Sequence, residues 1–311
     1  MSFDMRIALA VNHSAGTFNR MALEPTVAAI AEIFRAGGHE VEVCICGRRD
    51  LAGTLSALAE RTDLDTVVCG GGDGTVLTAI LAGLGRDRPL GILPLGTLNL
   101  LARDLGLPLD PLEAARLLAH SHAASIDLAE VNGLPFAIWA SLGMHPWIVR
   151  RRDKMQRGGY RKWPAFALAA LRAFRRYPLV RVTLSADGRQ RTFNTPLLVI
   201  SNNAWHEQML PPTRAALDRG ELVVHVAKVS SRLGLLWLAL RTLVGAWNAS
   251  SLLDTFKVDE VRVISRKRRV MVSLDGEVTV LRSPLVFKLR PGGLRVLMPT
   301  ITDNNVRPQE R

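Results

Sequence analysis

Val67 to Ile80, VVCGGGDGTVLTAI, is the stretch that decides the fold of the N-terminal half of the chain. An apolar run typical of a buried strand leads into three glycines, Asp73 and a fourth glycine, and a segment typical of a helix follows. Glycines here let the backbone turn tightly and bring its N–H groups close to a bulky anion, which the positive end of the helix also attracts. The stretch predicts a phosphate-binding loop; a tight connection without a ligand is the alternative.

The spacing of this loop excludes two common phosphate loops. No lysine follows it as in a Walker A loop, and counting from Gly70 or Gly72 puts Thr75 or Leu77 where the dinucleotide fingerprint needs its last glycine. Asp73 favours a ligand, because a carboxylate beside phosphates is repulsive unless it engages a metal, a water or a ribose hydroxyl.

Segments on either side of the loop alternate between strand and helix patterns. The expected strands are Arg6 to Val11, Val41 to Cys46, Thr66 to Cys69 and Leu90 to Pro94, and the expected helices are Met21 to Ala36, Leu51 to Arg61 and Thr75 to Leu84. This order is typical of a parallel sheet with helices on both faces.

After about residue 124, strand-like segments follow one another. They are Ile126 to Val131, Pro135 to Ala140, Val180 to Ser185, Thr192 to Ser201, Leu222 to Val229, Glu260 to Ile264, Arg269 to Leu274, Glu277 to Leu281, Leu285 to Leu289 and Gly293 to Met298. Helical segments interrupt them at Lys162 to Tyr177 and Ser231 to Ala249. The pattern predicts an antiparallel second domain, a sandwich or a barrel.

A second loop, PLGTLNLLARDLGLP from Pro94 to Pro108, follows the next strand of the first domain. Loops at the carboxyl ends of parallel strands converge on one crevice, so we expect Thr97 and Asn99 to face the same site as the glycines. The alternative is a plain helix start with a threonine cap.

The net charge of +12 on 311 residues indicates a polyanionic partner: nucleic acid, anionic lipid or a phosphorylated small molecule. Nucleic acid is disfavoured, because aromatic residues are only 5% and do not alternate with basic ones in a known motif. Three cysteines without a C-x-x-C pair favour a reducing cytosol over a disulfide framework or a zinc site. We see no export signal and no membrane-spanning run, and expect a cytoplasmic protein.

Four motifs occur in order: Asn12-His-Ser-Ala-Gly16, GGGDGT at Gly70 to Thr75, PLGTLNLLARDLGLP, and LDGE at Leu274 to Glu277. Together they resemble the diacylglycerol/sphingosine/ceramide lipid kinase family in its soluble bacterial form. GGDGT alone is shared with NAD kinases and resembles a phosphofructokinase motif, so the combination carries the resemblance. It implies a nucleotide-binding α/β domain over residues 1–124 and a β-rich lipid-substrate domain over residues 125–311. ATP would lie in the cleft between them, and the C-terminal end would pack back on the first domain.

The resemblance also implies site residues. Gly70, Gly71, Gly72, Asp73, Gly74, Thr75 and Val76 would hold the ATP phosphates, and Asn12, Cys44, Thr97 and Asn99 would line the nucleotide. Glu277 is the expected general base that takes the proton of a lipid hydroxyl as it attacks the γ-phosphate, with Mg²⁺ neutralising charge. Asp73 and Asp275 complete the expected catalytic set. Without the other motifs, Leu274 to Glu277 reads as a hairpin turn.

The sequence departs from the family pattern at three positions. His13 replaces a proline, Leu100 stands where an aspartate often follows the asparagine, and Arg219 stands where some members have an aspartate ligand of a structural Mg²⁺. A guanidinium cannot coordinate a cation, so that site is either rebuilt with Asp218 or absent.

Basic residues are concentrated between Arg150 and Lys162, and they lead into an apolar-rich segment. This stretch suits peripheral docking on an anionic membrane that carries the lipid substrate, a diacylglycerol or a sphingoid- or ceramide-like lipid. A solvated basic loop before a core helix is the alternative. Two other functions stay open, an NAD kinase and a catalytically inactive nucleotide- or lipid-binding regulator, and so does the oligomeric state, with a homodimer as one option.

Overall fold

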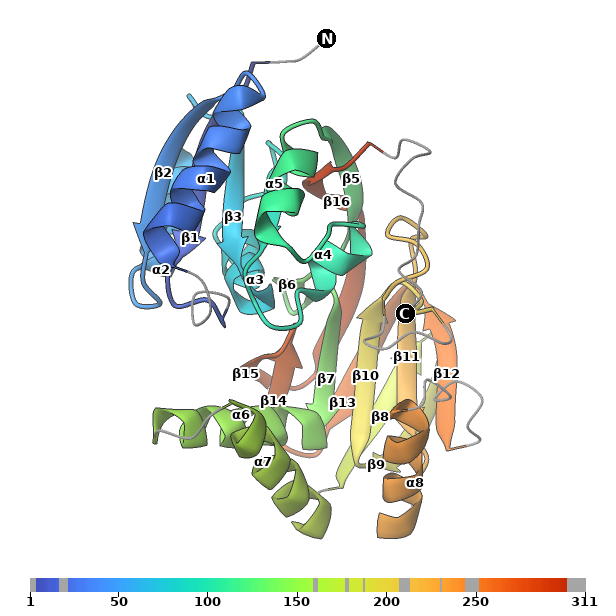
Figure 1. The fold of residues 1–311 in the computed structure, drawn as a ribbon. Coiled ribbons are helices and arrows are strands. Elements are labelled where there is room, and N and C mark those ends of the chain that lie inside the picture. Colours follow the sequence, from blue (N-terminus) through green and yellow to red (C-terminus); the bar gives the residue numbers. More distant parts are fainter. Residues whose placement is uncertain are drawn as a thin grey trace. The chain divides into compact units, whose positions relative to one another are not determined.

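The computed structural model describes residues 4–16, 22–158, 162–176, 179–186, 188–206, 213–229, 231–243 and 252–300 (Figure 1). The chain forms two compact units. The first runs through Ser125 and also takes in the chain from Leu294, and the second is Ile126–Gly293.

The first unit alternates strands and helices, as the sequence predicts. Its elements are β1 (Arg6–Asn12), α1 (Leu23–Ala36), β2 (Glu40–Cys46), α2 (Leu51–Glu60), β3 (Thr66–Gly71), α3 (Asp73–Leu81), β4 (Leu90–Pro94), α4 (Leu100–Asp104) and α5 (Pro111–Leu118). The strands pair in parallel in the order β2-β1-β3-β4. The last part of β16 (Leu285–Met298) adds a parallel strand beside β4, through Val296 and Leu90.

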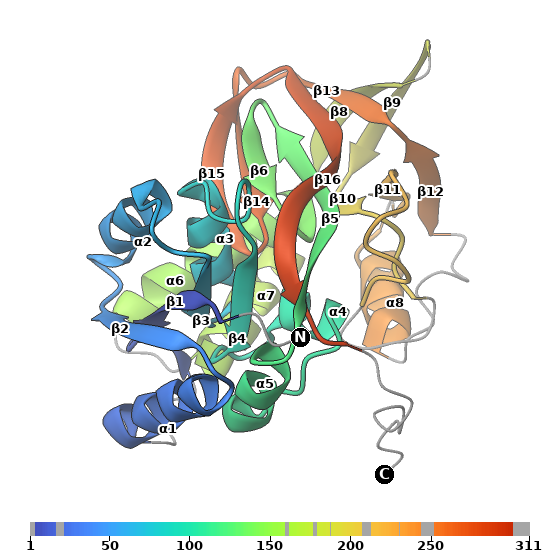
Figure 2. The same cartoon turned by 90° about the horizontal axis from the view of Figure 1, so that it is seen from above.

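Helices cover both faces of this sheet. Figure 2 shows α1 and α5 on one face, and α2 and α3 on the other. Every residue of β3 is buried, as a central strand covered on both faces requires. At the start of α5, the Asp110 carboxylate accepts hydrogen bonds from the N–H groups of Leu112 and Glu113, and Pro111 occupies the first turn.

The second unit is mainly antiparallel. Its elements are β5 (His122–Val131), β6 (Leu134–Phe136), β7 (Trp139–Gly143), α6 (Met144–Arg157), α7 (Lys162–Arg176), β8 (Val180–Ala186), β9 (Arg189–Thr195), β10 (Leu197–Asn202), β11 (Leu222–Ala227), α8 (Arg232–Leu243), β12 (Leu253–Val258), β13 (Glu260–Ser265), β14 (Arg269–Leu274), β15 (Glu277–Arg282) and the first part of β16. One sheet has the order β12-β11-β10-β7-β14-β15. Strands β9, β8, β13 and β16 pair in that order, and β5 pairs with β6 and β16. The predicted α/β domain followed by an antiparallel domain is confirmed.

Several predicted elements need correction. The helix after the glycines begins at Asp73 rather than Thr75, because β3 ends at Gly71 and Gly72 serves as the N-cap of the helix. Thr192 to Ser201 is two strands, since Pro196 lies between β9 and β10 and has no N–H for the ladder.

Two further segments differ from the sequence prediction. Pro135 to Ala140 is also two strands, because the N–H groups of Ala137, Ile138 and Trp139 turn toward the Asp275 carboxylate. Most of the basic stretch belongs to helix α6, which begins at Met144. From the sequence, a solvated loop was the alternative to a docking segment, and no helix was predicted there. Within the described ranges, no helix combines the length and apolar character that crossing a bilayer requires.

Candidate active site

The glycine loop joins β3 to α3 and owes its composition to close packing. None of Gly70, Gly71 and Gly72 has a positive φ. Instead, a Cβ at Gly70 would lie 2.9 Å from Leu95 Cδ1, and one at Gly71 would lie 2.4 Å from the Thr75 side chain. These glycines are therefore needed for close approach of neighbouring groups. From the sequence, a tight turn and the close approach of an anion were expected.

The same packing joins the glycine loop to the loop after β4. A Cβ at Gly72 would lie 3.1 Å from Gly96 Cα, and one at Gly96 would lie 2.3 Å from Gly72 Cα. The two backbones are thus in direct contact beside the N-terminal end of α3.

Gly71→Ala tests this packing. The added methyl group collides with Thr75, which is only 5% exposed, so we expect a loss of about 1–3 kcal/mol of stability and at least about tenfold weaker ATP binding. Calorimetric titration with ATP and thermal unfolding measure both effects. Gly53→Ala is the matched control, because nothing lies within 4 Å of its Cβ and alanine favours the helix. Unchanged ATP binding by Gly71→Ala would contradict the prediction.

The loop after β1 meets the glycine loop through Asn12. The Asn12 side chain is buried, and its Nδ2 donates to Thr75 Oγ1 at 3.0 Å while its Oδ1 accepts from the N–H of Ser14 at 3.0 Å. A Cβ at Gly16 would lie 3.3 Å from Thr97 Oγ1, and Thr97 is exposed. The end of β1 therefore contacts Thr75 of α3, and the loop after β1 approaches Thr97 of the loop after β4.

Asp73 holds the glycine loop to helix α4. Its Oδ1 accepts from the N–H of Leu100 at 2.7 Å and, more weakly, from that of Leu101 at 3.4 Å. Burial raises the pKa of Asp73, and the hydrogen bond from Leu100 opposes that rise. The sequence argument considered a metal, a water and a ribose hydroxyl as partners, and the structure adds a fourth, the first turn of α4.

Asn99 shapes the same loop from within. It is buried in the left-handed conformation, with φ 50° and ψ 50°. Its Oδ1 accepts from the N–H of Gly96 at 2.8 Å, and its Nδ2 donates to the carbonyl of Gly96 at 3.1 Å. Asparagine tolerates this conformation better than most residues, so Asn99 fixes the path of the loop that presents Thr97.

Substitutions at Asp73 distinguish its structural contact with α4 from its expected role in catalysis. At pH 7 the raised pKa means that the ionised carboxylate disfavours the folded state, and the neutral side chain of Asp73→Asn removes this cost while keeping an acceptor for Leu100. We expect the Tm of Asp73→Asn to equal or exceed that of the wild type, with kcat at least about 100-fold lower.

Asp73→Ala is the comparison variant, because it leaves the first turn of α4 without its acceptor. We expect it to lose about 0.5–2 kcal/mol of stability in addition to activity. Thermal unfolding and initial rates distinguish the two variants. An active Asp73→Asn would limit Asp73 to its structural contact.

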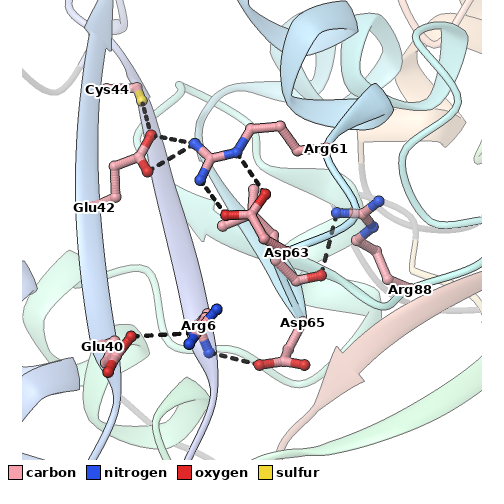
Figure 3. Close-up of polar contacts among 9 residues, drawn as sticks. Arg6, Glu40, Glu42, Cys44, Arg61, Asp63, Asp65 and Arg88 are labelled. Carbon is pink, nitrogen blue, oxygen red and sulfur yellow. Dashed lines mark hydrogen bonds and ion pairs between the residues drawn. The ribbon is translucent and has the colours of Figure 1, made fainter.

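Cys44 lies apart from these loop contacts. Its thiol donates to Glu42 on the same strand, at 3.5 Å, and burial raises its pKa. Figure 3 shows Glu42 between Cys44 and Arg61, which also binds Asp63. The hydrogen bond from Arg61 lowers the pKa of Asp63 to about 2. Cys44 thus belongs to a surface ion-pair network, and its predicted contact with a nucleotide stays a prediction.

The predicted DGE motif of the second unit forms the hairpin between β14 and β15. Asp275 and Gly276 both have positive φ, 46° and 88°, as a two-residue hairpin turn requires. The Asp275 carboxylate is buried and accepts from the N–H groups of Ala137 at 2.7 Å, Ile138 at 2.9 Å and Trp139 at 2.9 Å. Glu277 is the first residue of β15 and is exposed. The turn therefore presents Glu277 to solvent, while Asp275 anchors it.

Comparison with known proteins agrees with this geometry. The model of the diacylglycerol kinase catalytic domain matches residues 6–131, and that of the YegS C-terminal NAD kinase beta sandwich-like domain matches residues 140–298. A probable lipid kinase YegS-like protein of Pseudomonas aeruginosa is 32% identical over 289 residues, covering 85% of this chain and 91% of the relative. The chain belongs to this lipid kinase family.

Other members of the family are also similar. A diacylglycerol kinase of Mycobacterium tuberculosis is 31% identical over 216 residues, which is 63% of this chain and 69% of the relative. The crystal structure of a putative diacylglycerol kinase from Bacillus anthracis superposes with a TM-score of 0.75 at 22% identity, covering 94% of this chain and 97% of that one. That likeness supports the fold.

The predicted metal ligand of the second unit is Asp218, and its role stays a prediction. Asp218 is exposed, and the described part of the chain contains no group of three His, Cys, Asp or Glu side chains that could hold a metal. The buried Asp127 carboxylate instead accepts from the N–H of Gly220 at 2.7 Å, from Asn203 Nδ2 at 3.0 Å and from the N–H of Gly292 at 3.1 Å. The sequence analysis missed Asp127, whose signal is a lone acid in the apolar stretch SIDLA.

Only part of the basic stretch on α6 is available for docking. Arg150 is exposed, but the Arg152 side chain is only 19% exposed and pairs with Asp153 at 2.7 Å. Residues 159–161, which include Tyr160 and Arg161, lie outside the described residues. Neutralising Arg150, Arg151 and Arg152 together would therefore also break a largely buried ion pair.

Proposed function

We propose that this lipid kinase transfers the γ-phosphate of ATP to a hydroxyl group of a membrane lipid, a diacylglycerol or a sphingoid- or ceramide-like lipid. The observation that carries the proposal is the meeting of three loops at the start of α3, where closely packed glycine backbones lie beside the N–H donors of the helix. The comparisons support the reaction class through relatives named as lipid kinases.

The first unit has the features that a triphosphate needs. The first N–H groups of a helix have no carbonyl partner within it, and those of Asp73 and Gly74 begin α3. Phosphate oxygens are suitable acceptors for these donors. Thr97 and the Asn12–Thr75 pair would border the nucleotide, and Mg²⁺ would be held by phosphate oxygens with Asp73 as the carboxylate of the loop.

The acceptor hydroxyl needs a base. In the proposed step its oxygen forms a bond to the γ-phosphorus, the bond from that phosphorus to the β,γ-bridging oxygen breaks, and ADP leaves with the electron pair. The hydroxyl proton passes to the Glu277 carboxylate. The exposure of Glu277 and the three hydrogen bonds that fix the adjacent Asp275 support this assignment. Mg²⁺ supplies charge neutralisation at the phosphates.

A labelling experiment tests the function. The purified chain is incubated with γ-labelled ATP and Mg²⁺, and separately with vesicles containing diacylglycerol, vesicles containing ceramide or sphingosine, and NAD. We expect a labelled lipid and no labelled NADP. Labelled NADP would replace the proposal with an NAD kinase, and ATP binding without a labelled product from any acceptor would favour the regulatory alternative.

A further inference from the structure

We propose that the outer face of α8 lies in the interfacial layer of an anionic lipid bilayer. Four large apolar side chains of this helix are exposed: Leu233 at 77%, Leu236 at 45%, Trp237 at 55% and Leu240 at 47%. They stand at positions i, i+3, i+4 and i+7, and such positions form a single stripe along one helix face. We call these four residues the α8 stripe.

The opposite face of α8 is already packed. Leu235 and Leu238 are each 5% exposed and lie in a cluster with Ala227 and Val229, which Phe174 of α7 also joins. Both faces of α8 are therefore apolar, but the described residues of the chain cover only one of them. A helix that is apolar all round normally has a cover on every side, in a protein core or in lipid. The α8 stripe thus calls for an external apolar partner.

Charge identifies the kind of partner. The helix contains no Asp or Glu, and its arginines, Arg232 and Arg241, lie near its two ends. At 3.6 residues per turn they flank the α8 stripe on either side. The Arg241 guanidinium lies 6.0 Å from the centroid of the Trp237 ring. These side chains match the layers of an anionic membrane surface. The apolar stripe suits the acyl chains, the indole suits the level of the lipid carbonyl groups, and the arginines suit the phosphates.

The length of α8 decides how it meets the membrane. A span requires about 20 apolar residues, whereas α8 covers Arg232–Leu243. The helix therefore lies in the plane of the interface and inserts the α8 stripe among the acyl chains. The inference rests on the proposed function because the proposed lipid substrate is in the bilayer. Docking brings the kinase to the surface that holds this substrate.

Vesicle binding tests the inference directly. The full chain is sedimented with vesicles of phosphatidylcholine and phosphatidylglycerol, without ATP or acceptor. Leu233→Ser combined with Trp237→Ser removes two apolar side chains from the α8 stripe, and we expect at least about tenfold weaker partitioning. Leu109→Ser combined with Ile264→Ser is the matched control, because these side chains are 41% and 42% exposed and lie outside α8. Thermal unfolding confirms that both double variants are folded.

Insertion of Trp237 is measured separately. The emission of Trp237 is obtained as the difference in fluorescence between the wild type and Trp237→Phe. Brominated lipid in the vesicles is expected to quench this emission. Arg241→Gln is expected to weaken binding to anionic vesicles, with little effect on neutral ones, and salt is expected to act in the same direction. Equal vesicle binding by the stripe variant and its control would overturn the inference. A second result would also overturn it: the wild type is a dimer, the stripe variant is a monomer, and vesicle binding is the same for both. In that case a second copy of the chain would cover the α8 stripe.

A kinase assay keeps the two proposals apart. On a short-chain diacylglycerol dispersed as monomers, the stripe variant is expected to keep the wild-type kcat, while on vesicles it needs a higher lipid concentration to reach half its maximal rate. If the wild type phosphorylates no acceptor but binds vesicles through the α8 stripe, the proposed function fails and the docking inference holds. If both proteins phosphorylate vesicle lipid with equal concentration dependence, docking through α8 fails and the function holds.

Discussion

Replacing Glu277 with glutamine is expected to lower kcat by about 10²- to 10⁴-fold, because an amide cannot take the proton of the attacking hydroxyl. The side chain is exposed at the start of β15, and surface substitutions usually change stability little, so the Tm is expected to stay within about 2 °C of the wild type. The measurement is the initial rate of lipid phosphorylation at saturating ATP and acceptor, together with thermal unfolding.

Glu260→Gln is the matched control for this experiment. Glu260 is likewise an exposed first residue of a strand in the second unit, and it pairs with Lys288 at 3.1 Å. Its kcat is expected to equal that of the wild type. A Glu277→Gln variant with kcat within a few fold of the wild type would exclude Glu277 as the base. Asp73 would then be the acid to test next, because its carboxylate lies in the glycine loop.

The second large effect is expected on stability, at Asp275. Its carboxylate accepts three backbone N–H groups, from Ala137, Ile138 and Trp139. Asp275→Ala leaves these buried donors without that acceptor, and we expect a loss of about 3–5 kcal/mol, which lowers the Tm of the second unit by about 10 °C. Chemical denaturation with fluorescence detection measures the free energy of unfolding.

Asp275→Asn divides this effect. Oδ1 accepts from Ile138 and Trp139 and Oδ2 from Ala137, so an amide oriented with its oxygen at Oδ1 keeps two of the three bonds. We expect a loss of about 1–3 kcal/mol, smaller than that of the alanine variant. At a temperature where Asp275→Asn is folded, kcat is expected to fall less than in Glu277→Gln, because Asp275 positions the turn and does not take the proton. Equal stability of the alanine and asparagine variants would contradict this account.

The fold of the first unit could be predicted from the sequence because its signals are local. Apolar runs, helical periodicity and the glycine stretch identify its β-α alternation, and each signal lies within about 20 residues. The reason for the glycines could not be predicted in the same way. Gly72 needs its small size because of Gly96, which belongs to another loop, and sequence spacing does not reveal such a contact.

The role of the acids was harder to predict for a related reason. Asp73, Asp127 and Asp275 all use their carboxylates to accept backbone N–H groups from segments far away in the chain. A motif shows that an acid is present, but only the folded chain shows whether donors surround it. The exposed position of Glu277, by contrast, follows from the hairpin that Asp275 and Gly276 predict.

Helices α6 and α8 mark another limit of sequence reasoning. The frequent arginines and lysines of α6 indicated a loop or a docking segment, and the helix was not predicted. Its apolar face depends on a tertiary contact, because Ile148 packs in a cluster with Ala169 of α7. The apolar content of α8 was evident, but the exposure of one face follows only from the packing of the other.

Strand β16 has a consequence for how the protein is synthesised. Its last residues complete the sheet of the first unit beside β4, and Leu294, Val296 and Leu297 are each at most 1% exposed there. A ribosome that has made β1 to β4 has therefore left β4 with an unpaired edge, which is closed only after the second unit and β16 have been made. During that interval the nascent chain carries an exposed strand edge, which is a template for mispairing between neighbouring chains. The first unit therefore cannot complete its sheet until the second unit has been synthesised.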